Sequence, residues 1–417
     1  MDNFDIIVVG GGAAGLMAAS MAADRGKNVL VLEKMHQAGL KLRLTGKGRC
    51  NLTNTAPLKE FLTHVGSDSR FLRNSMSVFY NEELMQYFEQ RGVPLVIERG
   101  KRVFPKSGKS LDIFLALIGD LEQRANVTIR KNYAVQAIDT YTDDEGLRHV
   151  CGVRSKSGSI ACSRVLVATG GLSYPTTGST GAGLRWAEEL GHSVVPQVPS
   201  LVALVSEPRP EQTLQGFQLK NVSLTVRTND GKELCSHFGE MTFTDDGISG
   251  PIVLSASRIV SRHLNNGETL KAFIDLKPAI GRDELDRRLI NDLNQNGTRL
   301  FHDALRLWLP AELVPTALKQ LHIEYYKRLN QINGQERRRL LDFLKAMPLT
   351  LTATHGYDEA IVTQGGICLK EINPKTMESR LVKGLYFAGE VLDLDADTGG
   401  YNLQIAFSTG AAAGRNM

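Results

Sequence analysis

Residues 4–16 read Phe-Asp-Ile-Ile-Val-Val-Gly-Gly-Gly-Ala-Ala-Gly-Leu, a short β-branched run followed by a glycine-rich turn. The run predicts a strand buried in a parallel sheet, and the small residues after the turn predict a helix over 13–25 that Gly26 ends. Residues 28–33 predict a second buried strand. A β–α–β unit of about 30 residues with this pattern opens a doubly wound α/β fold.

The turn supplies a G-x-G-x-x-G pattern between strand and helix, in which Gly10 permits the tight turn and Gly15 lets helix and strand pack closely. At Gly12 a pyrophosphate can approach the backbone, and the first helical amides, at Ala13 and Ala14, face the phosphates. Glu33 ends the second strand, where an acid accepts the ribose hydroxyls of an adenosine and disfavours a 2′-phosphate. The alternative is a glycine-rich turn without a ligand. The pattern favours FAD or NAD over NADP.

Two further glycine-ended strands favour FAD. One is followed by Ala168, Thr169 and Gly170, and the C-terminal run 385–388 ends in Gly389-Glu390. A helix then opens at Gly400-Tyr401-Asn402-Leu403, and its amides can stabilise negative charge at the N1–O2 edge of a reduced flavin. Two chain ends that converge on one long cofactor fit FAD better than NAD.

The pattern of apolar strands followed by glycine turns stops near residue 195 and returns near residue 355. We therefore predict a first part of the dinucleotide-binding domain over 1–194, an insert over 195–354, and the second part of the domain over 355–417. Within the insert, 195–278 is rich in predicted strands and 279–348 is helical. The insert contains no second G-x-G-x-x-G, which argues against a dedicated NAD(P)H domain.

Composition is that of an ordinary globular protein, with 42% hydrophobic residues and a net charge of +4 from 49 basic and 45 acidic residues. This balance predicts neither a nucleic-acid nor a membrane partner. The five cysteines form no CxxC pair, which is typical of reduced thiols. With neither a signal peptide nor an apolar run of about 18 residues, we expect a cytoplasmic protein.

Several blocks of the sequence resemble one family. The blocks are 9–16, 44–54 (Leu-Thr-Gly-Lys-Gly-Arg-Cys-Asn-Leu-Thr-Asn), 168–174 with 177–183, 239–251, and 362–414 with its Gly-Gly-Tyr-Asn-Leu-Gln motif. In this order they resemble bacterial flavoproteins that carry a split FAD domain and an insert, among them aminoacetone-oxidase-like enzymes and reductases of unsaturated 3-oxo bile acids. The resemblance implies a glutathione-reductase-like doubly wound FAD-binding domain with an inserted β-rich and helical domain.

The resemblance also implies that the loop 45–51 lies against the flavin and that Val135 lies at the adenine. Besides the residues of the glycine turn and Glu33, the candidate cofactor contacts are Lys34, Lys41, Leu42, Thr45, Gly46, Gly48, Arg49, Cys50, Asn51, Val135, Ala168, Thr169, Gly170, Gly389, Glu390, Gly400, Tyr401, Asn402 and Leu403.

Other residues admit two interpretations. Cys50 beside Arg49 suggests a low-pKa redox thiol, against the commoner alternative of a buried apolar cysteine. Asp393, Asp395 and Asp397 suggest a metal site, but without a histidine or a calcium-loop pattern we predict no metal. No Ser-His-Asp set is discernible from residue order.

These observations predict an FAD-dependent oxidoreductase in which flavin N5 exchanges hydride with a small organic substrate, with NADH or NADPH as a transient reductant and no identifiable catalytic acid or base. One alternative is an oxygen-using amine or ketone oxidase. The other is a flavoprotein associated with nucleic acid, for which the helical part of the insert offers Arg282, Arg287, Arg288, Arg337, Arg338 and Arg339.

Overall fold

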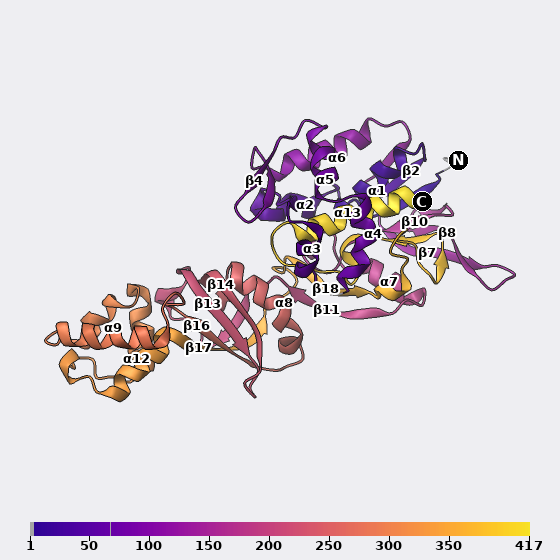
Figure 1. The fold of residues 1–417 in the computed structure, drawn as a ribbon. Coiled ribbons are helices and arrows are strands. Elements are labelled where there is room, and N and C mark those ends of the chain that lie inside the picture. Colours follow the sequence, from indigo (N-terminus) through magenta and orange to yellow (C-terminus); the bar gives the residue numbers. More distant parts are fainter. Residues whose placement is uncertain (1–3, 67) are drawn as a thin grey trace. The chain divides into compact units, whose positions relative to one another are not determined.

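The computed structural model describes residues 4–66 and 68–417. The protein divides into two compact units. The first joins the chain up to Pro199 to Tyr357–Met417, and the second is Ser200–Gly356. Both ends of the chain therefore belong to one unit, and the segment between them forms the other (Figure 1).

A five-stranded parallel sheet is the centre of the first unit. Its order is β20-β10-β1-β2-β6, and Val165 of β10 is in register with both Ile7 and Leu385. All residues of β1 and β2 are buried, as expected for aliphatic strands covered on both faces. The C-terminal strand thus completes the N-terminal sheet, as predicted for a split domain. The strands are β1 (Ile6–Val9), β2 (Val29–Leu32), β6 (Val127–Arg130), β10 (Val165–Val167) and β20 (Leu385–Phe387).

The first and last helices of the chain, α1 (Ala13–Ala23) and α13 (Tyr401–Asn416), pack side by side (Figure 1). Gly410 and Gly414 make this possible, because a Cβ at either position would lie 2.3 or 2.2 Å from the carbonyl oxygen of Ala14 or Ala18. The other helices of the unit are α2 (Leu40–Leu44), α3 (Leu58–Phe61), α4 (Arg73–Val78), α5 (Asn81–Glu89), α6 (Ser110–Glu122) and α7 (Ala182–Glu189).

Three smaller sheets complete the first unit and its boundary. They have the orders β19-β8-β7 with β9 beside β8, β3-β5-β4, and β11-β18. Their strands are β3 (Thr53–Asn54), β4 (Leu95–Glu98), β5 (Arg102–Pro105), β7 (Val135–Thr142), β8 (Arg148–Ser155), β9 (Gly158–Ala161), β11 (Val194–Ser200), β18 (Val362–Ile367) and β19 (Val382–Lys383).

The second unit is a closed barrel with its own hydrophobic core and attached helices. The barrel order is β12-β15-β14-β13-β16-β17, formed by β12 (Leu204–Glu207), β13 (Gln218–Arg227), β14 (Glu233–Phe243), β15 (Gly247–Ser249), β16 (Leu270–Asp275) and β17 (Met347–Thr354). The helices are α8 (Pro251–Asn265), α9 (Arg282–Gln295), α10 (Phe301–Ala304), α11 (Val314–Leu321) and α12 (Gly334–Ala346). Within residues 4–66 and 68–417, no helix is both long and apolar enough to cross a membrane.

Candidate functional site

The glycine turn between β1 and α1 is shaped by close backbone contacts. A Cβ on Gly10, whose φ is 107°, would lie 2.5 Å from the carbonyl oxygen of Ala168, and one on Gly15 would lie 2.0 Å from that of Gly10. A Cβ on Gly12 would meet nothing within 4 Å. Gly10 and Gly15 therefore serve packing, whereas the backbone at Gly12 is open at the start of α1, where helical amides lack intrahelical acceptors.

Glu33, directly after β2, is held by the same turn. Its Oε2 accepts a hydrogen bond from the Gly11 amide at 2.9 Å and its Oε1 one from the Met35 amide at 2.8 Å. Lys34 Nζ donates to Thr180 Oγ1 at 2.7 Å. Burial lowers the pKa of the Lys34 ammonium; Glu33 opposes this effect and Arg185 adds to it. The carboxylate of Glu33 is thus fixed beside the open glycine turn.

Candidate residues at two other strands, β10 and β7, lie around this turn. Ala168, which contacts Gly10, precedes Thr169 and Gly170 at the carboxyl end of β10. Val135 begins β7, two residues after Tyr133, whose amide donates to the Glu33 carbonyl at 2.9 Å. The structure therefore brings Val135 to the Glu33 side of the turn.

An ion pair connects the two ends of the chain near the turn. Lys41 Nζ of α2 lies 2.6 Å from Glu390 Oε2, and the Thr363 amide donates to Glu390 Oε1 at 2.7 Å. Leu42 beside it is buried. Gly389 is in the left-handed region at φ 77°, and a Cβ there would lie 2.9 Å from the Ala14 Cβ. The predicted ribityl contacts at 389–390 therefore lie against α1 and α2.

The loop 45–51 consists largely of left-handed backbone, with positive φ at Gly46, Lys47, Gly48 and Cys50. The Thr45 hydroxyl donates to the Leu42 carbonyl at 2.7 Å and fixes the start of the loop. Such a run exposes backbone on a side where ordinary residues would place a Cβ. The loop continues directly into β3.

The start of α13 packs against β3, immediately after this loop. A Cβ on Gly400 would lie 2.3 Å from the Thr53 carbonyl oxygen, and Asn54 Nδ2 donates to the Gly399 carbonyl at 3.0 Å. Tyr401 begins the helix, and Leu403 is half-buried on its first turn. The side chain of Asn402 accepts from the Ala396 amide at 2.9 Å and donates to the Ala396 carbonyl at 2.8 Å, so it braces the preceding loop.

Two polar atoms at this site fit a bound cofactor. Asn51 Oδ1 and Thr169 Oγ1 are shielded from solvent and have no hydrogen-bond partner within the described part of the chain. Buried polar atoms normally find partners. The open backbone at Gly12 lets a phosphate approach the start of α1, and the fixed carboxylate of Glu33 can accept from ribose hydroxyls. The residues present therefore fit a dinucleotide.

Cys50 is not an activated thiol, so the low-pKa interpretation is wrong. Its side chain is fully buried, and burial raises the pKa of the thiol to about 12 against a lowering hydrogen bond with Thr45. The Arg49 guanidinium instead pairs with Glu98 and lies 4.4 Å from the Phe104 ring centroid. Residues adjacent in sequence thus face different surroundings.

We expect a thiol reagent such as 5,5′-dithiobis(2-nitrobenzoate) to label exposed Cys151 within minutes and Cys50 only after unfolding. The measurement is labelling of the native protein followed by peptide mass spectrometry, with Cys151→Ser as the control that removes the fast phase. Fast labelling of Cys50 in the folded protein would restore the activated-thiol interpretation.

A Ser-His-Glu constellation that residue order did not reveal lies elsewhere in the first unit. His192 Nε2 lies 2.9 Å from Ser379 Oγ, and its Nδ1 lies 3.1 Å from Glu371 Oε2. Ser379 is 3% exposed, and its Oγ also accepts from the amides of Leu381 and Val382. A serine so enclosed has no access to a substrate, so the constellation braces the segment 371–382.

Because of the contacts of His192 with Ser379 and Glu371, which we call the brace, we predict that the stability of the protein depends on pH. Burial lowers the pKa of His192 below its ordinary 6.5, although Glu371 opposes the shift. Because the unfolded chain then binds the proton more readily, the brace contributes fully above pH 6.5 and loses stability as the pH falls below it. We expect the melting temperature to fall between pH 7 and 5.5, and to fall less steeply in His192→Gln. Equal slopes would contradict the assignment.

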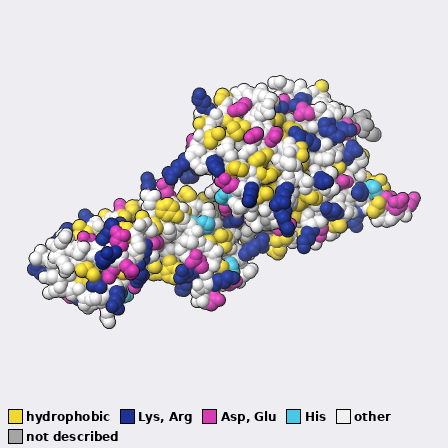
Figure 2. All heavy atoms as spheres, in the orientation of Figure 1, with side chains coloured by type: hydrophobic (Ala, Val, Ile, Leu, Met, Phe, Trp, Pro, Cys, Tyr) yellow, Lys and Arg dark blue, Asp and Glu magenta, His cyan; other side chains and the backbone are white. Residues whose placement is uncertain are grey.

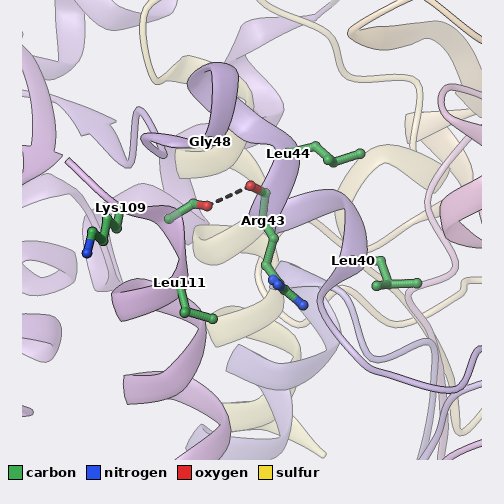
Figure 3. A pocket seen from close by; sticks show the side chains of 7 residues that line it. Leu40, Arg43, Leu44, Gly48, Lys109 and Leu111 are labelled. Carbon is green, nitrogen blue, oxygen red and sulfur yellow. Dashed lines mark hydrogen bonds between the residues drawn. The ribbon is translucent and has the colours of Figure 1, made fainter.

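A hollow of about 450 Å³ lies between α2 and the start of α6 (Figure 3). Leu40, Leu44 and Leu111 form apolar walls, and Arg43 and Lys109 add positive charge. Ser110 Oγ donates to the Arg43 carbonyl at 2.6 Å and ties α6 to α2 there. No group of three or more His, Cys, Asp or Glu side chains in residues 4–66 and 68–417 is arranged to hold a metal ion.

Comparison with known proteins identifies the family. The model of the HI0933-like protein Rossmann domain matches residues 4–416, nearly the whole chain. The chain belongs to the HI0933-like family. The resemblance to bacterial flavoproteins with a split FAD domain is thereby confirmed.

Three curated relatives of this HI0933-like protein match over almost their full lengths. The 3-dehydro-bile acid delta(4,6)-reductase of Clostridium scindens is 32% identical over 98% of this chain and 97% of the relative. The ribosomal RNA dihydrouridine synthase of Haemophilus influenzae is 30% identical over 97% and 96%, and that of Escherichia coli is 28% identical over 100% and 98%.

Among solved structures, 3-ketosteroid delta1-dehydrogenase from Sterolibacterium denitrificans aligns with a TM-score of 0.50 at 14% identity, over 99% of both chains. This similarity concerns the fold. The HI0933-like chain is an FAD-dependent oxidoreductase with a Rossmann-type FAD-binding fold and an inserted β-barrel.

Proposed function

We propose that this oxidoreductase reduces a carbon–carbon double bond conjugated to a carbonyl group, with NADH or NADPH as the hydride source. Two of its relatives are named for reactions of this kind, a bile-acid reductase and a dihydrouridine synthase, and this supports the proposal. The Δ4 and Δ6 bonds of a 3-dehydro bile acid are conjugated to its 3-oxo group. Dihydrouridine arises by saturation of the uracil C5–C6 bond, which is conjugated to the C4 carbonyl. In either substrate, a hydride added to the carbon remote from the carbonyl and a proton added to the carbon next to the carbonyl would saturate the bond.

The residues of the site would hold FAD along its whole length. Glu33 would accept the adenosine ribose hydroxyls, and the backbone at Gly12 would contact the pyrophosphate. Glu390, paired with Lys41, would accept from the ribityl chain. The start of α13 would stabilise negative charge on the flavin, whose N5 supplies the hydride chemistry when bound. These contacts are the ones predicted from the sequence, and they remain predictions.

Anaerobic flavin spectroscopy tests the reaction in two steps. We expect NADH or NADPH to bleach the visible flavin absorbance within seconds, and a 3-oxo-4,6-diene bile acid or another conjugated enone to restore it in proportion to product formed. Bleaching by neither nucleotide, together with rapid reduction by amines or alcohols, would contradict the proposal and favour the oxidase alternative.

A base in RNA is the second candidate substrate, and the charge distribution of the first unit favours it. Residues 39–51 and 95–111 contain nine Lys or Arg residues and one acidic residue, Glu98. The two segments touch, since Ser110 Oγ donates to the Arg43 carbonyl and Arg49 lies over Phe104. We call this the basic face; it includes β4, and near that strand Figure 2 shows Lys and Arg side chains among hydrophobic and acidic ones. Its exposed cations are Lys47, Arg49, Arg99, Lys101, Arg102, Lys106 and Lys109.

Such a face suits a phosphate backbone, and because it includes the loop 45–51 it would bring a base toward the predicted flavin position. This differs from the sequence prediction of no nucleic-acid partner, which rested on the overall charge of +4. The local excess of positive charge is hidden in that sum by acidic residues elsewhere.

Charge reversal tests the second candidate. We expect Lys106→Glu combined with Lys109→Glu to weaken binding of ribosomal RNA transcribed in vitro and to reduce the salt slope of the affinity by about one per residue. Lys156→Glu, on the exposed β8–β9 turn, is the matched control. Formation of dihydrouridine, read by mass spectrometry, decides for RNA. Salt-independent or absent RNA binding, with turnover of the enone, decides for the small molecule.

A further inference from the structure

A histidine, a carboxylate and a tyrosine form a fixed cluster in the first unit. His64 Nδ1 lies 2.8 Å from Asp397 Oδ2, and the imidazole stacks on the Tyr401 ring with centroids 4.5 Å apart and planes inclined by 21°. A backbone hydrogen bond joins the same two residues, because the Asp397 amide donates to the His64 carbonyl at 3.0 Å. A side-chain bond, a ring contact and a backbone bond together fix the orientation of the imidazole.

The cluster lies at the start of α13, where the flavin is predicted. Tyr401 is the first residue of that helix, and its ring also packs edge-on against Phe61 at 4.9 Å. The loop that carries Asp397 is braced by Asn402, which contacts the backbone of Ala396. The imidazole therefore shares its support with residues predicted to contact the cofactor.

Conjugate reduction needs a proton donor that can be recharged from water. The His64 side chain is 35% exposed, so solvent protons reach it. Other groups of the first unit are less suitable: burial raises the pKa of Cys50 to about 12. Burial and the carboxylates of Glu60 and Asp397 likewise raise the pKa of Tyr401 to about 12. The His192 side chain is 0% exposed.

We propose that His64, oriented by Asp397, donates the proton that completes the reduction of the conjugated double bond. This inference rests on the proposed function and holds for either substrate. Reduced FAD, when bound, would supply the hydride with its electron pair from N5–H to the carbon remote from the carbonyl, and the conjugated electrons would move to the carbonyl oxygen. The carbon next to the carbonyl then takes the proton released from His64 Nε2, while Asp397 accepts from Nδ1–H. Water reprotonates the imidazole.

The chain contains a matched control. His149 Nε2 lies 2.6 Å from Asp143 Oδ2, and its ring stacks on Tyr141 at 5.2 Å and 17°. This second His-Asp-Tyr cluster lies on the β7–β8 hairpin, at the end away from Val135. His149→Gln thus removes the same group from the same kind of setting without touching a predicted cofactor residue.

The test uses full-length holoprotein in anaerobic stopped flow, with a 3-oxo-4,6-diene bile acid or ribosomal RNA, whichever the wild type reduces. We expect His64→Gln to slow reoxidation of the flavin by substrate by about 10²–10⁴-fold. Flavin reduction by the nicotinamide, FAD content per chain and the melting temperature of the apoprotein should stay at wild-type values. Free imidazole should restore part of the rate in His64→Ala. His149→Gln should match the wild type in every readout.

The rate of reoxidation should also lose its dependence on the ionisation of a histidine in His64→Gln. Asp397 pairs with that imidazole and Tyr401 stacks on it, and the carboxylate of Glu60, which pairs with Lys101, acts on Tyr401. Asp397→Asn should slow the same step by a smaller factor and leave FAD content unchanged, as expected of a positioning residue.

The outcomes separate the two proposals. A wild-type protein that reduces neither substrate overturns the proposed function. A wild-type protein that turns over, with a His64→Gln variant that reoxidises at the same rate, overturns the assignment of His64 alone. Loss of FAD or of apoprotein stability in His64→Gln, without rescue by imidazole, assigns His64 a structural role.

Discussion

Replacement of Gly410 by alanine is expected to destabilise the first unit by roughly 1–3 kcal/mol. The added Cβ would lie 2.3 Å from the Ala14 carbonyl oxygen and 3.0 Å from its carbonyl carbon. Both atoms belong to the backbone of α1, so no side chain can turn away, and the two helices must separate along their contact. Because α13 begins with the predicted flavin contacts at 400–403, FAD content should fall as well. Urea unfolding followed by release of FAD measures both effects.

Gly119 is the matched control, since it also lies inside a helix, α6, but an added Cβ would meet nothing within 4 Å. Gly119→Ala should therefore stabilise the protein by about 0.5–1 kcal/mol through the higher helix propensity of alanine. If the free energy of unfolding falls in Gly410→Ala and rises in Gly119→Ala, the contact between helices determines the effect of the substitution, and the loss of a helical glycine does not. A neutral Gly410→Ala would show that α1 and α13 can separate without loss.

The elements predicted best from sequence are those whose signal is local. Within the predicted runs 4–9 and 28–33, Ile6–Val9 and Val29–Leu32 form buried aliphatic strands, and Leu385–Phe387 does so within the C-terminal run 385–388. A parallel strand covered on both faces must be apolar throughout, so it can be recognised from its own residues without knowing which strands it pairs with. This is why the split sheet could be predicted, including the strand that returns from the far end of the chain.

The closed barrel of the second unit could not be predicted in this way. Its closure depends on β12 pairing with β17, so that Leu204 lies opposite Thr354. Half-exposed antiparallel strands specify an inner and an outer face, but not which distant strand each will pair with. Only the hairpin of β13 and β14, joined by a turn at 229–231, had a local signal.

The same limit applies to the site. The pairs that shape it join residues 349 positions apart for Lys41 and Glu390, and 333 for His64 and Asp397. No spacing rule connects such residues, whereas the glycine turn and Glu33 form one local unit. The prediction of an activated thiol at Cys50 failed for the opposite reason, because adjacency in sequence did not place the two side chains together. Arg49 points to Glu98 and Phe104 instead.

Glu33→Ala is expected to lower the affinity for FAD by roughly 100-fold or more, since two hydrogen bonds from ribose to a carboxylate are each worth about 1.5–3 kcal/mol. The geometry of the carboxylate supports this magnitude. Amides of Gly11 and Met35 hold both oxygens, so little freedom is lost when a ribose binds. Titration of the apoprotein with FAD, followed by quenching of flavin fluorescence, measures the change in Kd.

Two controls isolate the ribose contact from the support that Glu33 gives to the glycine turn. Glu33→Gln keeps the size of the side chain and one oxygen acceptor, so its Kd should lie between those of the wild type and Glu33→Ala. At saturating FAD, both variants should be reduced by the nicotinamide at the wild-type rate, because the adenosine end lies far along the cofactor from the reacting N5. If Glu33→Ala binds FAD with unchanged affinity, the adenosine ribose does not lie at Glu33. If affinity falls and the melting temperature of the apoprotein falls equally in both variants, the carboxylate acts by holding Gly11 and Met35, and the ribose contact is secondary.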